Sequence, residues 1–77
     1  MIDVTKDYDP RYVQVRRQRA AEILGVSPSE LDRLRKDDPD CPQGFKHSDA
    51  RNSPVMFRLS DLYAYSEKRM QAAHKAA

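Results

Sequence analysis

The fold is decided by residues 19–34, which read RAAEILGVSPSELDRL. Apolar side chains recur at helical spacing on both sides of Gly25, which predicts two helices over residues 17–24 and 28–36. Glycine commonly ends a helix because it adopts the left-handed backbone conformation at low cost. The two helices are therefore expected to be joined by a turn of only three residues.

The spacing within these helices is typical of a helix-turn-helix. Ala21 is small enough to let the helices cross closely, and Leu31 and Leu34 fall where they would anchor the second helix on the first. Ser27 and Glu30 form the pattern of a capping box, in which each side chain bonds the other's backbone amide. An ordinary helical hairpin with a glycine turn is the alternative. The spacing, the capping box and the basic flanks together favour the helix-turn-helix.

Two short strands and a last helix are expected downstream. Residues 45–48 and 55–59 have strand character, and the polar residues 49–54 would join them into a hairpin with an exposed tip. Ser60 is expected to cap a helix that runs from Asp61 to about Lys75. The predicted fold is α+β, mainly α: a winged helix-turn-helix of order α-α-β-β-α in a single small domain, with a flexible N-terminal arm at 1–11, the domain at 12–70 and a frayed tail at 71–77.

Composition excludes several classes of protein. A chain of 77 residues buries only about 60% of the surface that its unfolded form exposes, and it is too small for a large catalytic cleft. No apolar run approaches the roughly 20 residues of a membrane span, and no signal-peptide core follows Met1. We therefore expect no membrane association and a cytoplasmic location.

The sequence contains no pattern typical of a catalytic or metal site. Cys41, the one cysteine, cannot form an internal disulfide. Together with His47 and His74 it makes too few ligands, too widely scattered, for zinc. No glycine-rich phosphate loop and no Ser/His/Asp set in a plausible scaffold is present. We therefore expect no enzymatic activity, no cofactor and no metal.

Charge is unevenly distributed along the chain. The formal net charge is only +2. Residues 11–36 nevertheless carry seven bases against three acids, and residues 45–59 carry three bases against one, whereas residues 37–44 hold three aspartates and no base. Local basic surface attracts a polyanion even when the total charge is small. A solvated charged face is the alternative, and the charge pattern alone does not decide between them.

A helix-turn-helix places the start and outer face of its second helix in the DNA major groove. Arg33 is the best base reader, because a guanidinium can bond guanine N7 and O6 together. Ser29 can read a base or hold a phosphate. Asp32 can accept from a cytosine amino group, or merely orient Arg33 or Lys36. The predicted DNA-binding residues are Arg16 and Arg17, which would meet phosphates at the start of the first helix; Ser27, Ser29, Asp32, Arg33 and Lys36 on the second; and Lys46, His47, Arg51 and Asn52, which would touch phosphates or the minor groove from the wing.

Four motifs carry a resemblance to a known family. They are RAAEILGVS at 19–27, LDRL at 31–34, Pro42 with Phe45-Lys46, and FRLSDL at 57–62. In this order they make the stretch from Val15 to Met70 resemble the AlpA-type regulators and phage excisionases, small winged-helix proteins of the MerR-like class. The resemblance implies a recognition helix in the major groove, a wing in the adjacent minor groove, and a role on the DNA of a mobile genetic element. It also implies that the cytoplasmic location is the nucleoid of a bacterium.

Three functions remain open at this point. The favoured one is an excisionase, or recombination directionality factor, that binds and bends attachment-site DNA to promote integrase-mediated excision. The alternative is an AlpA-type transcriptional regulator that binds a promoter and contacts RNA polymerase. A protein-interaction module without DNA binding is less favoured. The acidic residues Asp37, Asp38 and Asp40 and the bases Lys68, Arg69 and Lys75 would suit head-to-tail self-association on DNA, although a solvated connector explains the acidic segment equally simply.

Overall fold

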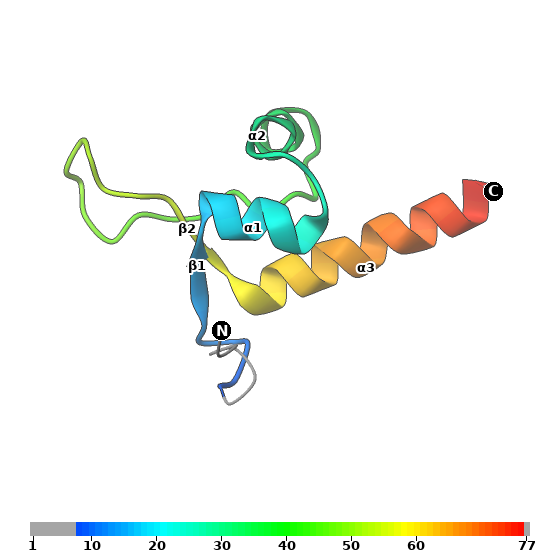
Figure 1. Ribbon diagram of the computed structural model, residues 1–77, viewed down its shortest axis with the longest axis horizontal. Coiled ribbons are helices and arrows are strands. Elements are labelled where there is room, and N and C mark those ends of the chain that lie inside the picture. The colour runs from blue at the N-terminus through cyan, green and yellow to red at the C-terminus, as the bar shows by residue number, and fades with distance from the viewer. Residues whose placement is uncertain (1–7, 77) are drawn as a thin grey trace.

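The computed structural model describes residues 8–76. Residues 1–7 of the predicted arm and Ala77 of the predicted tail lie outside the described residues. Along the described chain the elements are β1 (Gln14–Arg16), α1 (Arg17–Leu24), α2 (Pro28–Asp37), β2 (Met56–Arg58) and α3 (Leu59–Ala76). This part of the chain is a small α+β domain of three helices and a two-stranded antiparallel sheet (Figure 1).

The first two helices form as predicted. Gly25 ends α1 in the left-handed region, with a φ of 72°. Ser27 precedes α2 and its Oγ accepts a hydrogen bond from the Glu30 amide at 3.1 Å. No hydrogen bond from Ser27 N–H to the Glu30 carboxylate is present in the described chain, so only half of the capping box forms. α2 extends to Asp37, one residue beyond the prediction.

Of the two strands predicted at 45–48 and 55–59, the second is confirmed as β2, whereas the first is wrong. In the first of these segments only Phe45 pairs, through an isolated bridge to Met56 with N···O distances of 2.9 and 2.7 Å. The other edge of β2 pairs with β1, where Val15 lies opposite Phe57. The element order in the described chain is therefore β-α-α-β-α rather than α-α-β-β-α.

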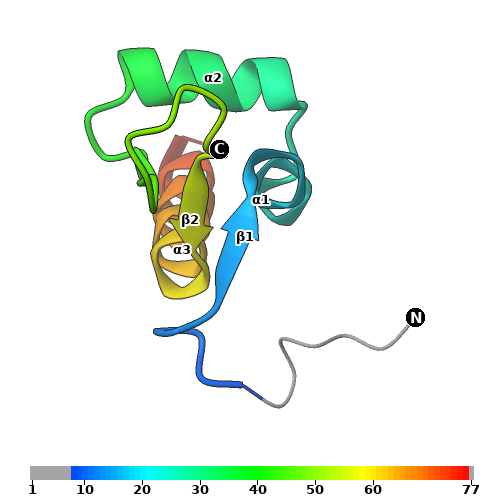
Figure 2. The same ribbon diagram turned by 90° about the vertical axis from the view of Figure 1, so that its left-hand side faces the viewer.

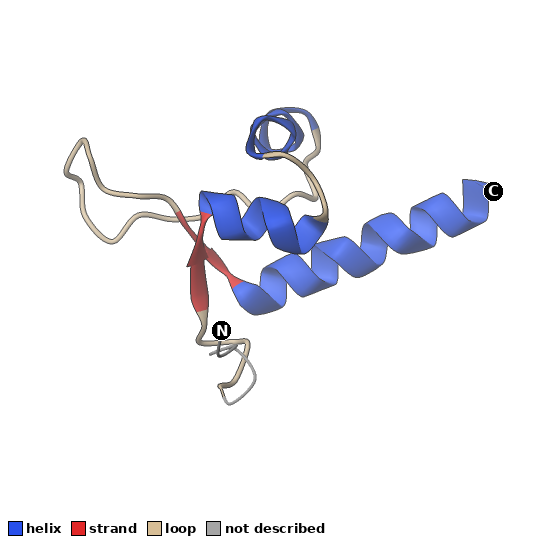
Figure 3. Cartoon of the chain, in the orientation of Figure 1, coloured by secondary structure: helices blue, strands red, loops and turns tan. Residues whose placement is uncertain are grey.

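The sheet forms between different segments than predicted because residues 46–53 and β1 differ in their apolar side chains. Residues 46–53 contain no large apolar side chain, so a strand there would bury nothing. Val15, by contrast, brings a buried side chain to the fully buried Phe57. Burial of apolar surface drives strand pairing in a half-buried sheet. The sheet therefore forms between the two segments that carry buried residues, and residues 46–54 remain a loop (Figure 3).

The last helix begins at Leu59, two residues before the predicted start, and Ser60 lies inside its first turn rather than capping it. The amide of Leu59 donates to the Val13 carbonyl at 2.9 Å, and that of Ser60 donates to the Pro10 carbonyl at 3.1 Å. Backbone carbonyls of the N-terminal segment thus satisfy amides that helix starts leave open. α3 continues through residues 71–76 of the predicted tail.

The core lies where α1, α2, the sheet and α3 meet. Its largest fully buried side chains are Leu31, Phe57, Leu59 and Leu62. This packing holds α2 across the top of the molecule (Figure 2). The loop at 46–54 projects from the side at which α1 begins, while the second half of α3 extends away on the opposite side (Figure 1).

Candidate nucleic-acid interface

The outer face of α2 is polar and exposed. Leu31 is fully buried and fixes which side of the helix meets the core. Ser29 and Arg33 each stand two residues from Leu31, about 160–200° around a helix axis that turns about 100° per residue. Lys36 lies one turn beyond Arg33, and all three side chains are exposed. The predicted recognition residues therefore share one outward face.

The start of α1 carries a second set of basic residues. Arg16 is the N-cap residue, and it makes no side-chain capping bond. Arg17 and Arg19 follow, and the first turn holds no acidic residue. Arg19 also approaches Glu22, with an Nη1–Oε2 distance of 3.7 Å. The first turn of α1 thus contributes arginines and no carboxylate of its own at the positive end of the helix dipole, an arrangement that favours anions.

The loop at 46–54, the predicted wing, carries the third set of predicted residues. Lys46, His47, Arg51 and Asn52 are all exposed. His47 is nevertheless tied to the sheet, because its Nε2 hydrogen-bonds the Gln14 side chain and its ring meets Phe45 edge-on at 5.4 Å. The loop and the start of α1 both face the viewer in Figure 2, where the upper part of the loop passes in front of α2. The structure thus makes the three segments that carry these residues neighbours in the fold.

Asp32 has a different neighbour from the ones considered in the sequence analysis. Its two carboxylate oxygens accept hydrogen bonds from Arg17 Nε at 2.9 Å and Nη2 at 2.6 Å. Arg35 Nη1 lies 3.9 Å from the same carboxylate, and neither Arg33 nor Lys36 bonds it in the described chain. The hydrogen bonds from Arg17 lower the pKa of Asp32 below its ordinary value of 3.8, so the carboxylate is ionised at neutral pH.

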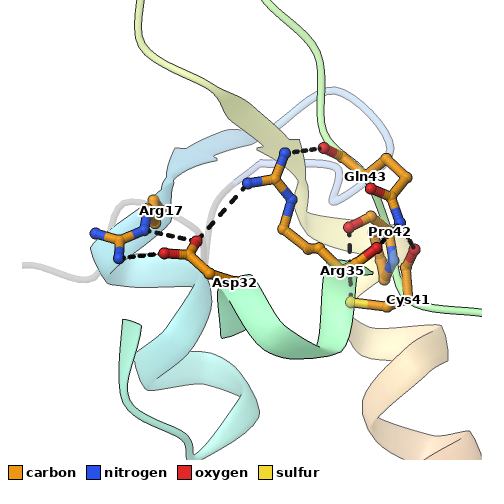
Figure 4. Close-up of polar contacts among 6 residues, drawn as sticks. All are labelled: Arg17, Asp32, Arg35, Cys41, Pro42 and Gln43. Atoms are coloured by element: carbon orange, nitrogen blue, oxygen red, sulfur yellow. Dashed lines mark hydrogen bonds and ion pairs between the residues drawn. The ribbon is translucent and has the colours of Figure 1, made fainter. Parts of the chain in front are cut away.

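Arg35 is a residue whose role the sequence analysis missed. It stands four residues after Leu31, which places it on the inward side of α2, and its side chain is only 24% exposed. Its Nη2 donates to the Gln43 carbonyl at 2.7 Å, and Gln43 Nε2 donates back to the Arg35 carbonyl at 2.6 Å. Its guanidinium also lies 5.3 Å from the centre of the Phe57 ring. Arg35 therefore holds α2 to the following loop (Figure 4), and the i+4 spacing was the signal for it.

The acidic segment after α2 contacts α3 within the same chain. The Tyr65 hydroxyl donates to Asp38 Oδ2 at 2.7 Å, and Lys68 Nζ lies 3.2 Å from Asp40 Oδ2. The Tyr65 hydrogen bond lowers the pKa of Asp38, while burial raises the pKa of Tyr65. Two of the three aspartates considered for contact with a neighbouring copy therefore have partners inside the domain.

Within residues 8–76, no group of three or more His, Cys, Asp or Glu side chains is arranged to hold a metal ion. No helix of the described chain has the length and apolar character needed to cross a membrane. Comparison with family models, curated proteins and solved structures found no match for this chain. The resemblance to AlpA-type regulators and excisionases, which rests on sequence motifs, therefore stays a prediction.

Proposed function

We propose that this protein binds double-stranded DNA site-specifically, as a winged helix-turn-helix formed by α1, α2 and the loop at 46–54. The observation that carries the proposal is that three segments with exposed basic residues are neighbours in the fold. Arg17 at the start of α1 hydrogen-bonds Asp32 on α2, and His47 of the loop hydrogen-bonds Gln14 of β1, the strand that runs into α1. A concentrated basic surface attracts the phosphate backbone and orients the approach to it.

In this proposal α2 enters the major groove with its outer face. Arg33, at the centre of that face, donates two hydrogen bonds to guanine N7 and O6. Ser29 and Lys36 contact a neighbouring base or phosphate. Arg16 at the start of α1 contacts the backbone, and the loop residues Lys46, Arg51 and Asn52 contact phosphates or the adjacent minor groove. His47 also belongs to the proposed contact residues of the loop, and its side chain is hydrogen-bonded to Gln14.

We further propose that the protein acts as an excisionase-type factor on the DNA of a mobile element. The support is the order of the four sequence motifs, which span most of the chain. An excision factor binds several adjacent sites and bends the DNA, whereas a promoter-binding regulator needs only one site beside a polymerase.

The experiment is quantitative binding to duplexes that cover the DNA flanking the gene, followed by footprinting of the bound fragment. We expect affinity to fall linearly with salt on a log–log scale, because each phosphate contact releases counterions. Affinity that does not change with salt would refute DNA binding. Arg33→Ala should weaken the site preference by relaxing the choice of one base pair, whereas the matched control Arg69→Ala, on the exposed part of α3, should leave binding to a single site unchanged.

Two further readouts separate the candidate roles. Stepwise shifts on a fragment with several sites, together with bending measured on circularly permuted fragments, would support the excision factor. A single unbent complex with a footprint at a promoter would support the AlpA-type regulator instead.

A further inference from the structure

One ion pair joins the start of α1 to the flank of α2. Arg17 and Asp32 are 15 residues apart in the sequence, and two parallel hydrogen bonds of 2.9 and 2.6 Å connect them. Their side chains are 45% and 47% exposed, so the pair lies on the surface rather than in the core. Exposed ion pairs generally contribute little to folding stability.

The geometry leaves one end of the Arg17 guanidinium available. Nε and Nη2 face Asp32, and the third nitrogen points away from it (Figure 4). No hydrogen bond or ion pair in the described chain occupies this Nη1. Because a guanidinium is planar, two bonds to one carboxylate also fix the direction of the remaining N–H groups.

We propose that Asp32 is a positioning residue, which holds Arg17 so that its Nη1 donates to a DNA phosphate oxygen, and that Asp32 does not itself read a base. This inference rests on the proposed function. A carboxylate beside DNA repels the phosphates, so its presence on the binding face requires a compensating benefit. The benefit is preorganisation: a long side chain already held in its bound conformation loses less freedom on binding.

The test is a double-mutant cycle with Arg17→Ala, Asp32→Asn and the two combined. The probe is a duplex selected by the wild-type protein from a random-sequence pool, and affinity is measured over a series of KCl concentrations. Arg17→Ala should reduce the salt slope by about 0.9, which corresponds to about eightfold in affinity between 0.1 and 1 M salt. Asp32→Asn should weaken binding while Arg17 is present, and should leave it unchanged or strengthen it once Arg17 is alanine.

A matched control comes from the N-terminal turn. Arg11 and Asp9 form an exposed pair of similar geometry, with an Nη2–Oδ2 distance of 2.6 Å. This turn lies below the sheet, away from α2 (Figure 1). Arg11→Ala and Asp9→Asn should show no coupling in DNA affinity. Equal coupling in the two pairs would attribute the effect to bulk charge and overturn the inference.

The base-reading alternative makes a different prediction. If Asp32 accepts from a cytosine amino group, Asp32→Asn will change the preference at one base pair even in the Arg17→Ala background, and the inference is then wrong. Arg17→Lys provides a conservative variant that keeps the charge but lacks the planar fork. It should retain the salt slope and lose the coupling to Asp32.

The outcomes separate this inference from the function on which it rests. If the wild-type protein binds no duplex in a salt-dependent manner, both the proposed DNA binding and the positioning role of Asp32 are refuted. Wild-type binding with additive effects of Arg17→Ala and Asp32→Asn overturns the positioning role alone. Circular dichroism melting of each variant verifies that the protein remains folded, and Arg17→Lys replaces Arg17→Ala in the cycle if the alanine variant does not fold.

Discussion

The α1–α2 pair and the loop at 46–54 are built by different rules. The helical pair places Ala20, Ala21 and Leu24 of α1 and Leu31 of α2 in the core, and Leu31 is fully buried. Residues 46–52 of the loop are exposed without exception, and one bridge between Phe45 and Met56 closes its base. The difference shows that α2 is placed by packing, whereas the predicted wing is held only near its base, by the bridge to β2 and by the hydrogen bond between His47 and Gln14.

The strongest test of this difference is to remove the buried side chain that fixes α2 on the core. Leu31→Ala should lower the free energy of unfolding by about 2–5 kcal/mol, because it deletes buried methyl groups and leaves a cavity. Urea denaturation followed by circular dichroism measures the loss. Leu34→Ala, at a half-buried position on the same helix, should cost less, and an equal loss would contradict the central role of Leu31.

Gly44, at the base of the loop, occupies a position that disfavours any larger residue. An added Cβ would lie 2.6 Å from Val55 Cγ1 and 2.9 Å from the Met56 carbonyl oxygen, and the φ of +77° already disfavours an L side chain. Gly44→Ala should therefore cost about 1–2 kcal/mol of backbone strain and about 1–3 kcal/mol more from overpacking. Gly25→Ala is the matched control. It shares a positive φ, but its Cβ would meet nothing within 4 Å, so only the strain should appear in its denaturation midpoint.

If α2 and the loop both contact DNA, substitutions in the two regions should change DNA binding in different ways. Arg33→Ala should cost about 1–3 kcal/mol at the preferred site and relax the choice of one base pair, as loss of a bidentate guanine contact does. Arg51→Ala should weaken binding to all sequences alike and lower the salt slope by about 0.9. Competition between the selected duplex and a scrambled one measures both effects. A change of sequence preference in Arg51→Ala would show that the loop reads bases.

The smallest expected effect concerns the contact that fastens the end of α2 to α3. Because the Tyr65 hydroxyl lowers the pKa of Asp38 below 3.8, this carboxylate stabilises the fold above that pH. The contribution is lost as the pH falls through the lower pKa of the folded state. Tyr65→Phe should therefore flatten the decline of the melting temperature on acidification. Asp38→Asn should flatten it at least as much, because the backbone amide of Asp40 also lowers the pKa of this carboxylate. An unchanged acid limb in both variants would contradict the assignment.

The part of the fold that follows local rules could be predicted from the sequence. Gly25 and Ser27 fix the end of α1 and the start of α2 by backbone conformation and capping, which depend only on neighbouring residues. The pairing of Val15 with Phe57 could not be predicted in this way, because it depends on which distant segment offers an apolar side chain. The start of α3 was misplaced for the same reason, since its open amides are satisfied by Val13 and Pro10.

The candidate site follows the same division. Exposure of Ser29, Arg33 and Lys36 follows from their spacing around Leu31, and it is confirmed. The partner of Asp32 could not be read from spacing along α2, because Arg17 reaches it from another helix. Whether these residues contact DNA stays a prediction until binding is measured.

The pairing of β1 with β2 also determines when the domain can fold during synthesis. α1 and α2 are close in sequence and can approach each other early, but Val15 gains its partner only when Phe57 has been made. Contacts between residues so far apart in sequence form late, because closing the long loop between them has an entropic cost. A nascent chain that ends before β2 would therefore lack the core residues Phe57, Leu62 and Tyr65, and we expect it to depend on the ribosome or a chaperone until the last third of the polypeptide emerges.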